Sequence, residues 1–240
     1  MRSSNPALRG NAFATMARQA DSGAMTIQGT VNKTFILLAL TLFSASFIWG
    51  NPQKYLPFMI PAVIGGLIVA IVTIFKKEWA PVTSPIYALL EGLVIGAISA
   101  LMERSYPGIV TQAVILTFGT LFCLLMAYKS RLIKASENFK LGVMAATGAV
   151  ALVYIVGMVM SLFGGSIPLI HNSGPVGIIF SLVVVTIAAL NLVLDFDFIE
   201  KGSQCGAPKY MEWYGAFGLM VTLIWLYLEI LRLLAKLRRR

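Results

Sequence analysis

Four carboxylate residues lie within or at the edges of segments that are apolar enough to span a bilayer: Glu91, Asp195, Asp197 and Glu229. Placing one charged side chain at the centre of a bilayer costs about 2.5–3.5 kcal/mol, so such residues usually face a cavity, a charged partner or a moving ion. Carboxylate oxygens are suitable ligands for hard cations such as Ca²⁺. These residues therefore point first to a pathway for cations or protons.

The composition is that of an integral membrane protein. The chain is 58% hydrophobic and only 12% charged over 240 residues, which leaves too little polar surface for a soluble globule of this size. The net charge of +9 would suit nucleic acid, but the basic residues lie between apolar segments and at the two ends. Cytoplasmic loops and lipid headgroups favour them there. We therefore expect the lipid bilayer, and no nucleic acid, as a partner.

Seven apolar segments follow a polar stretch of residues 1–32, which we expect to be a flexible cytoplasmic tail. Each is about long enough for a helix with a rise of 1.5 Å per residue to cross a hydrocarbon core of roughly 30 Å. The prediction is an all-α polytopic membrane protein, with a seven-transmembrane-helix bundle over residues 33–235 and a basic tail at 236–240. The predicted spans are Lys33–Trp49, Tyr55–Phe75, Ser84–Met102, Gly108–Tyr128, Phe139–Phe163, Val176–Ile199 and Lys209–Leu234.

Lys and Arg in the short connections predict the orientation. With the N-terminus inside, twelve basic residues fall on the cytoplasmic side and only Lys54 and Arg104 in outer loops, as expected for cytoplasmic loops. The basic C-terminus is the exception, because seven crossings place it outside, whereas one re-entrant segment would place it inside. We predict seven spans in a bacterial plasma membrane, since the basic N-terminus has no apolar core of a cleaved signal peptide.

Small residues recur at intervals that allow helices to approach closely. Gly92 and Gly96 are four residues apart in the third segment. In a bilayer, lipid offers no hydrophobic drive for helix association, so small residues at this spacing let van der Waals contacts hold helices together. We expect the third helix to pack closely against a neighbour along this face.

Glu91 and Asp195 are expected at similar depth from the cytoplasmic side. Asp195 lies four residues before the end of the sixth segment, with Asn191 one turn earlier on the same face. Glu91 lies about seven residues, or roughly 10 Å, into the third segment. A carboxylate in apolar surroundings needs a proton, a cation or a basic side chain as its counter-charge. We predict that Asp195, Glu91 and Asn191 line an ion or proton pathway, with the two carboxylates as transient Ca²⁺ ligands.

Lys76 and Lys77 close the second segment on this same side. A lysine there can form an ion pair with an ionised carboxylate and release it when the carboxylate takes up a proton. We therefore consider both lysines as latch candidates.

Asp197 and Glu229 are weaker candidates for the pathway. Asp197 lies about 200° around the helix from Asp195, so we favour a position at the membrane interface beside Lys201. Glu229 precedes Arg232 by three residues, a spacing that allows an ion pair on one helix face. We favour a structural role for both carboxylates.

The run Leu194-Asp195-Phe196-Asp197-Phe198-Ile199 resembles the Bax inhibitor-1 family, in which an aspartate opens a short Asp-x-(Gln/Asn)-x-Ile stretch at this place. The third segment, with Glu91-Gly92, and the last segment are also similar, so the likeness covers about residues 33–235. The resemblance implies a seven-helix membrane protein. Members of that family include pH-sensitive calcium leak channels and suppressors of cell death or stress, and its bacterial members lie in the plasma membrane.

The resemblance also implies a proton-sharing pair of aspartates on the sixth and seventh helices, latched to an arginine at the end of the second. Asp195 matches the first aspartate. A gapless alignment of the last helix places Thr222 at the second position, whereas the local Leu-Tyr-Leu-acid pattern would place Glu229 there. Because threonine does not ionise in this range, we predict that Glu91 supplies the missing carboxylate and that Lys76 or Lys77 replaces the arginine.

Three classes of function remain open at this point. The leading one is a passive, proton-gated cation pathway, for calcium in particular. The others are a proton-coupled transporter, and a regulatory membrane protein that binds a membrane protease or a stress- or death-pathway partner. An enzyme is not expected, because the single histidine, His171, has no catalytic or metal-binding motif to partner it. The two cysteines also lack metal-site spacing, so we expect no resident cofactor.

Overall fold

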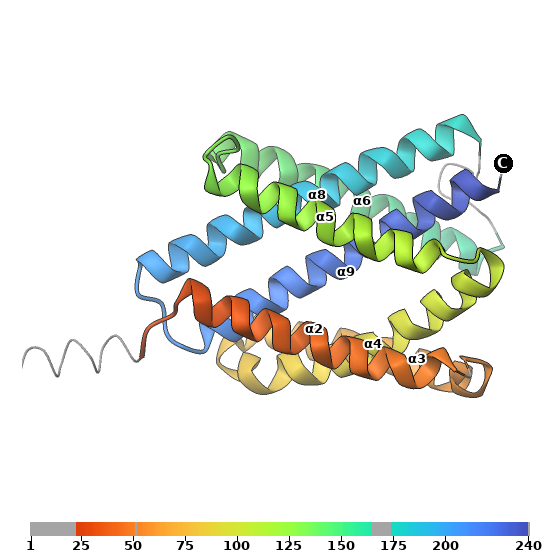
Figure 1. The fold of residues 1–240 in the computed structure, drawn as a ribbon, viewed down its shortest axis with the longest axis horizontal. Coiled ribbons are helices and arrows are strands. Elements are labelled where there is room, and N and C mark those ends of the chain that lie inside the picture. Colours follow the sequence, from red (N-terminus) through yellow and green to blue (C-terminus); the bar gives the residue numbers. More distant parts are fainter. Residues whose placement is uncertain (1–22, 51, 165–173, 240) are drawn as a thin grey trace, which may run out of the picture.

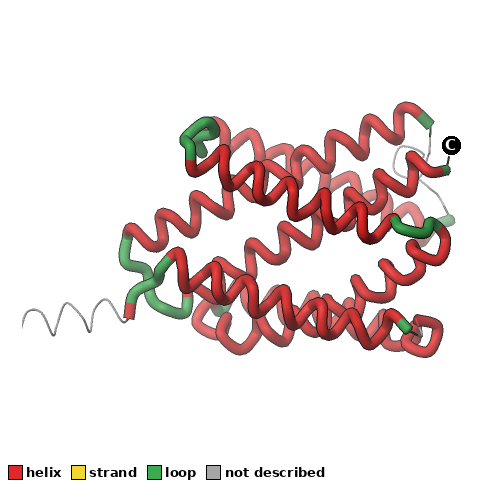
Figure 2. The backbone as a smooth tube through the Cα atoms, viewed as in Figure 1, coloured by secondary structure: helices red, strands yellow, loops and turns green. Residues whose placement is uncertain are grey.

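The described chain is a bundle of long helices. In this computed structural model, residues 23–50, 52–164 and 174–239 are described. Seven helices are long and apolar enough to cross a membrane, and Figure 2 shows only helices and loops among these residues. The helices are α2 (Ile27–Trp49), α3 (Pro52–Phe75), α4 (Ala80–Ser105), α5 (Ile109–Lys129), α6 (Glu137–Leu162), α8 (Pro175–Gln204) and α9 (Met211–Arg238), with a short 3₁₀ turn, η2 (Lys77–Trp79). The predicted seven-helix membrane bundle is confirmed.

Helix α9 runs through the middle of the bundle. Figure 1 shows it between one group formed by α2, α3 and α4 and another formed by α5, α6 and α8. Small and aliphatic side chains are buried along most of its length, so neighbouring helices can pack on several of its sides. Its tightest partners are α8, α2 and α5.

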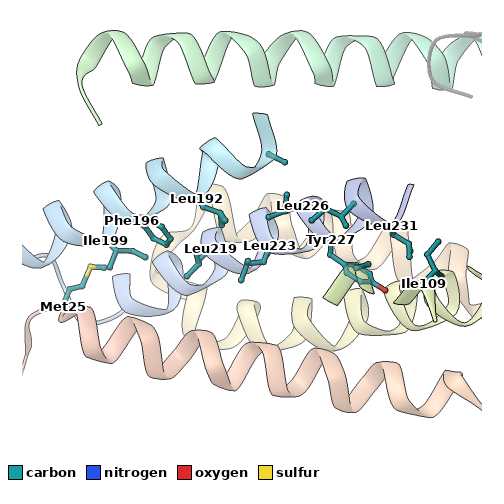
Figure 3. Packing of buried hydrophobic residues seen from close by; sticks show 13 residues of the cluster. Met25, Ile109, Leu192, Phe196, Ile199, Leu219, Leu223, Leu226, Tyr227 and Leu231 are labelled. Carbon is teal, nitrogen blue, oxygen red and sulfur yellow. The ribbon is translucent and has the colours of Figure 1, made fainter. Parts of the chain in front are cut away.

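Two apolar clusters hold these groups to α9. The larger joins α8 and α5 to α9, and Figure 3 shows Leu192 and Phe196 of α8 beside Leu219 and Leu223 of α9. The smaller cluster joins α2 and α4 to α9 around Met220. Because both clusters include α9, this helix positions the other helices relative to one another.

The first helix begins earlier than predicted. It starts at Ile27, where the Thr26 hydroxyl accepts a hydrogen bond from the Gly29 amide and caps the first turn. Residues 27–32 are therefore helix, and the predicted tail over residues 1–32 was too long. The polar or small residues Gln28, Gly29, Thr30 and Asn32 obscured this start. Lys33, one turn later, forms an ion pair with Glu212 from the far end of the chain. Residues 1–22 of the predicted tail, and His171, lie outside the described residues.

The sequence predicted a basic tail at residues 236–240. Its residues 236–238 are instead the last part of α9, which continues to Arg238. The buried Lys236 amine donates to the Gly177 carbonyl at 3.0 Å and to Ser181 Oγ at 2.8 Å. Arg238 donates to the Pro107 carbonyl at 2.7 Å. The described chain begins and ends at opposite ends of the bundle (Figure 1), as an odd number of crossings requires.

Candidate functional site

A cavity of about 500 Å³ lies where α3, α4, α8 and α9 meet. Most of its wall is apolar. Its polar side chains are Asp195 from α8, Thr222 and Tyr214 from α9, and Tyr87 from α4. The cavity therefore brings one carboxyl group and three hydroxyl groups together among membrane-spanning helices.

Asp195 is the ionisable group of this cavity. Its Oδ2 atom is buried and has no hydrogen-bond partner among the described residues. Across from it, α9 presents Gly218 and, one turn later, Thr222. A Cβ atom added at Gly218 would lie 3.8 Å from Asp195 Oδ1, so the glycine keeps this side of the carboxyl group open. The gapless alignment that placed Thr222 opposite Asp195 agrees with this geometry.

Glu91 lies outside the cavity wall. It interacts with Tyr87, one turn earlier on α4, and its carboxyl group is near Gly66 of α3. Among the described residues, no hydrogen bond joins Glu91 to Asp195. Tyr87 connects Glu91 to the cavity, because its side chain interacts with Glu91 and also lines the cavity wall. The structure therefore does not bring the two predicted carboxylates into direct contact.

The two latch candidates lie directly after α3, and Lys77 is the first residue of the 3₁₀ turn η2. Neither Lys76 nor Lys77 forms an ion pair within the described part of the chain. Lys77 instead places its amine 5.3 Å from the centre of the Tyr214 ring, and Tyr214 lines the cavity that contains Asp195. Lys77, rather than Lys76, is thus the lysine linked to the cavity.

Asp197 is paired at the end of the bundle. It accepts from Lys140 at 2.9 Å and from Lys201 at 3.0 Å. It therefore belongs to an ion-pair cluster between α6 and α8, and Lys201, which the sequence placed beside it, is one of its two partners.

Three polar side chains, each seven residues from the next, attach α6 to the bundle. Lys140 pairs with Asp197, Thr147 accepts from Asn191 at 2.7 Å, and Tyr154 donates to Glu229. Among the α6 residues whose burial is described, the buried ones are Val143 and Val150, which lie between these three, and Gly157. Residues seven apart share one helix face. Asn191 was predicted to line the pathway. It instead donates a hydrogen bond to Thr147 of α6 and is not part of the cavity wall.

Glu229 is fully buried and neutralised. Arg232 donates to its two oxygens at 3.0 and 3.1 Å, and the Tyr154 hydroxyl donates to Oε1 at 2.8 Å. The Arg232 guanidinium also lies 5.1 Å from the centre of the Tyr154 ring. The structural ion pair predicted for Glu229 is present, and Tyr154 ties it to α6.

We expect Tyr154→Phe to destabilise the protein by about 1 kcal/mol, because the ring remains but Glu229 and Arg232 lose a buried hydroxyl partner. Thermal unfolding in detergent measures this change. Tyr214→Phe is the matched control, since the Tyr214 hydroxyl makes no hydrogen bond among the described residues. Equal stability of the two variants would show that the Tyr154 hydroxyl does not contribute.

A further buried carboxylate, Glu212, was not among the residues that the sequence analysis singled out. It is completely buried at the start of α9. It accepts from Lys33, from Lys209 at 2.9 Å, and from the Thr26 amide and hydroxyl at 2.9 and 2.8 Å. Every partner comes from the start of α2 or the loop before α9. These contacts fix the start of α2 to the start of α9, and we call them the Glu212 lock. Only the three-residue spacing between Lys209 and Glu212 could be seen in the sequence.

Tyr87, Tyr214 and Gly218 were also missed by the sequence reasoning. Tyrosines in apolar helices are most often packing residues, so neither tyrosine was predicted to belong to the site. The available signals were spacing: Tyr87 precedes Glu91 by one turn, and Gly218 precedes Thr222 by one turn.

The described residues contain no group of three or more His, Cys, Asp or Glu side chains arranged to hold a metal ion. Ca²⁺ takes six to eight oxygen ligands. Asp195 with Thr222 and two tyrosines provides fewer, so the side chains of this cavity do not complete a Ca²⁺ ligand shell.

The sequence model of the family described as Bax inhibitor 1 like matches residues 5–239. The chain belongs to the Bax inhibitor 1 like family. As a member it is an integral, multi-pass membrane protein. The match to this Bax inhibitor 1 like family begins well before residue 33, so the predicted limit of the likeness at residues 33–235 was too narrow. A search of curated proteins gave no match.

Proposed function

We propose that this Bax inhibitor 1 like protein lets cations, calcium among them, pass across the membrane, and that a proton on Asp195 controls the passage. The observation that supports this most is the buried Asp195 Oδ2 atom, which has no hydrogen-bond partner among the described residues and borders a cavity. An ionised carboxylate in such surroundings requires a counter-charge. No described lysine or arginine pairs with it, which leaves a proton or a cation.

The two forms of Asp195 have different consequences for the cavity. When protonated, the carboxyl group is neutral and can donate a hydrogen bond to a neighbouring hydroxyl such as Thr222. When ionised, it attracts a cation into the cavity, and it also attracts the Lys77 amine that now lies on Tyr214. The ionised carboxylate binds either the cation or Lys77, and protonation removes the charge that attracts both, so the proton decides whether the site can bind a cation.

Calcium flux into liposomes that contain the purified protein tests this proposal. With a single titrating group, flux should change by about tenfold per pH unit on one side of its midpoint. We expect Asp195→Asn to remove this pH dependence, because asparagine keeps the shape but cannot titrate. Asp197→Asn is the matched control, since Asp197 lies two residues away and is held by two lysines.

Glu91→Gln tests whether the second carboxylate contributes. Its link to the cavity runs through Tyr87, so we expect a shifted pH midpoint with the pH dependence retained. An unchanged profile would exclude the coupling of Glu91 to Asp195. Saturable, proton-coupled exchange in place of passive flux would instead assign the cavity to a transporter.

A further inference from the structure

A long groove separates α2 from α5 on the side of the bundle away from the Asp195 cavity. Two cavities, of about 410 and 530 Å³, lie along it and share Leu38 and Phe118. Helices α2 and α5 form its walls and do not pack closely against each other, while side chains of α4, α8 and α9 form its floor. Because the cavities share wall residues, they form one continuous groove.

The groove is about as long as a bilayer is thick. Its lining on α2 extends from Ile27 to Trp49. A helix of this length rises roughly 35 Å, against about 30 Å for the hydrocarbon core. Side chains at its edge, such as Phe35 and Leu42, are 67% and 65% exposed. An extended apolar chain lying along the bilayer normal fits this space.

Charge is confined to one end of the groove. Lys129, Arg131 and Glu200 line the larger cavity, whereas the lining of the smaller one contains no charged residue. Glu200 is already engaged, by Arg131 at 2.9 Å and by the Tyr128 hydroxyl. Lys129, the last residue of α5, is exposed and forms no ion pair among the described residues. The free charge at this end is therefore positive.

We propose that the groove binds an anionic phospholipid, with one acyl chain between α2 and α5 and the phosphate beside Lys129 and Arg131. Such a lipid would join two helices that do not pack against each other directly. No residue of the groove lines the Asp195 cavity, so this proposal does not depend on the proposed function. Each basic residue near a membrane surface raises the affinity for anionic lipid about five- to sixfold.

Native mass spectrometry of the full chain in detergent tests the headgroup end. Phosphatidylglycerol and phosphatidylcholine with identical acyl chains are the two probes. We expect tighter binding of phosphatidylglycerol, reduced about fivefold by Lys129→Gln. The matched control is Lys134→Gln, because Lys134 is exposed nearby but does not line the groove. Equal binding of the two lipids, or equal effects of the two substitutions, would overturn the proposal.

Two tryptophan substitutions test the groove itself. Leu125 and Leu116 are 43% and 48% exposed on α5, and only Leu125 lines the groove. We expect Leu125→Trp to reduce phosphatidylglycerol binding several-fold and Leu116→Trp to leave it unchanged, with thermal unfolding confirming that both fold. If Leu125→Trp does not fold, the lysine comparison decides alone. A lipid-independent dimer that Leu125→Trp disrupts would assign the groove to a second copy and refute lipid binding.

Discussion

Replacing Glu212 with alanine should destabilise the protein by about 3 kcal/mol. Removing one member of a buried ion pair costs about 3–5 kcal/mol, because the remaining charge stays buried without its partner. We take the low end because Lys33 and Lys209 keep 18% and 49% of their side chains exposed and solvent screens part of the effect. The Thr26 amide and hydroxyl also lose their acceptor.

The Glu212 lock has a structural consequence beyond its charge. It holds the start of α2 against the loop before α9, where the Met25 amide also donates to the Ala207 carbonyl at 2.7 Å. There is no room for a side chain at the crossing, because a Cβ atom at Gly29 would lie 2.1 Å from Glu212 Oε1. We therefore expect Glu212→Ala to expose the segment around Met25 to hydrogen exchange before the rest of the bundle.

Thermal unfolding and hydrogen exchange in detergent measure both effects. The matched control is Glu137→Ala. Glu137 also begins a helix and pairs with a lysine three residues away, but its side chain is 82% exposed, so the cost should be within about 1 kcal/mol. Equal destabilisation by the two substitutions would show that the buried network around Glu212 contributes no more than an exposed pair.

Gly92→Ala should be the most disruptive small substitution in the membrane region. Helices α2 and α4 pack more closely than any other pair in the described chain. A Cβ atom at Gly92 would lie 2.4 Å from the Thr41 carbonyl oxygen. This neighbour is backbone, so the two helices must separate along their whole contact. We expect a loss of about 3 kcal/mol, at the upper end for overpacking.

Gly119→Ala is the control for this substitution. Gly119 lies in the middle of α5, and an added Cβ atom would meet nothing within 4 Å. Alanine favours helix over glycine by up to about 1 kcal/mol, so this variant should be slightly more stable than the wild type. The two substitutions should thus change the unfolding temperature in opposite directions, and a fall of equal size in both would contradict the close crossing.

The sequence predicted the helices well and their ends less well. Span length and hydropathy are properties of each segment alone, so α3 and α5 end within one residue of the prediction. The start of α2 could not be predicted in this way, because residues 27–32 are mostly polar or small. The Thr26 cap and its bonds to Glu212, 186 residues away, hold this start in place. Likewise, the bonds of Lys236 to Gly177 and Ser181 explain why α9 continues into a basic segment.

The candidate site was only partly predictable. A carboxylate in an apolar segment is conspicuous, so Asp195 was found from the residues alone, and Thr222 was placed opposite it only through the family resemblance. Depth alone suggested Glu91, but depth does not fix rotation about the helix axis, and Glu91 faces Tyr87 and α3. Asn191 illustrates the same limit, since a residue one turn from Asp195 bonds to α6 instead.

The most direct test of the proposed function follows the Asp195 carboxyl group and calcium flux together. Infrared difference spectroscopy across a pH series records the band of a protonated carboxyl group, and flux is measured in the same liposomes. We expect one carboxyl band to titrate with the same midpoint as the flux. In Asp195→Asn, the band and the pH dependence of the flux should both disappear, whereas both should persist in Asp197→Asn. If Asp195→Asn keeps the pH dependence of flux, Asp195 does not control the passage of cations.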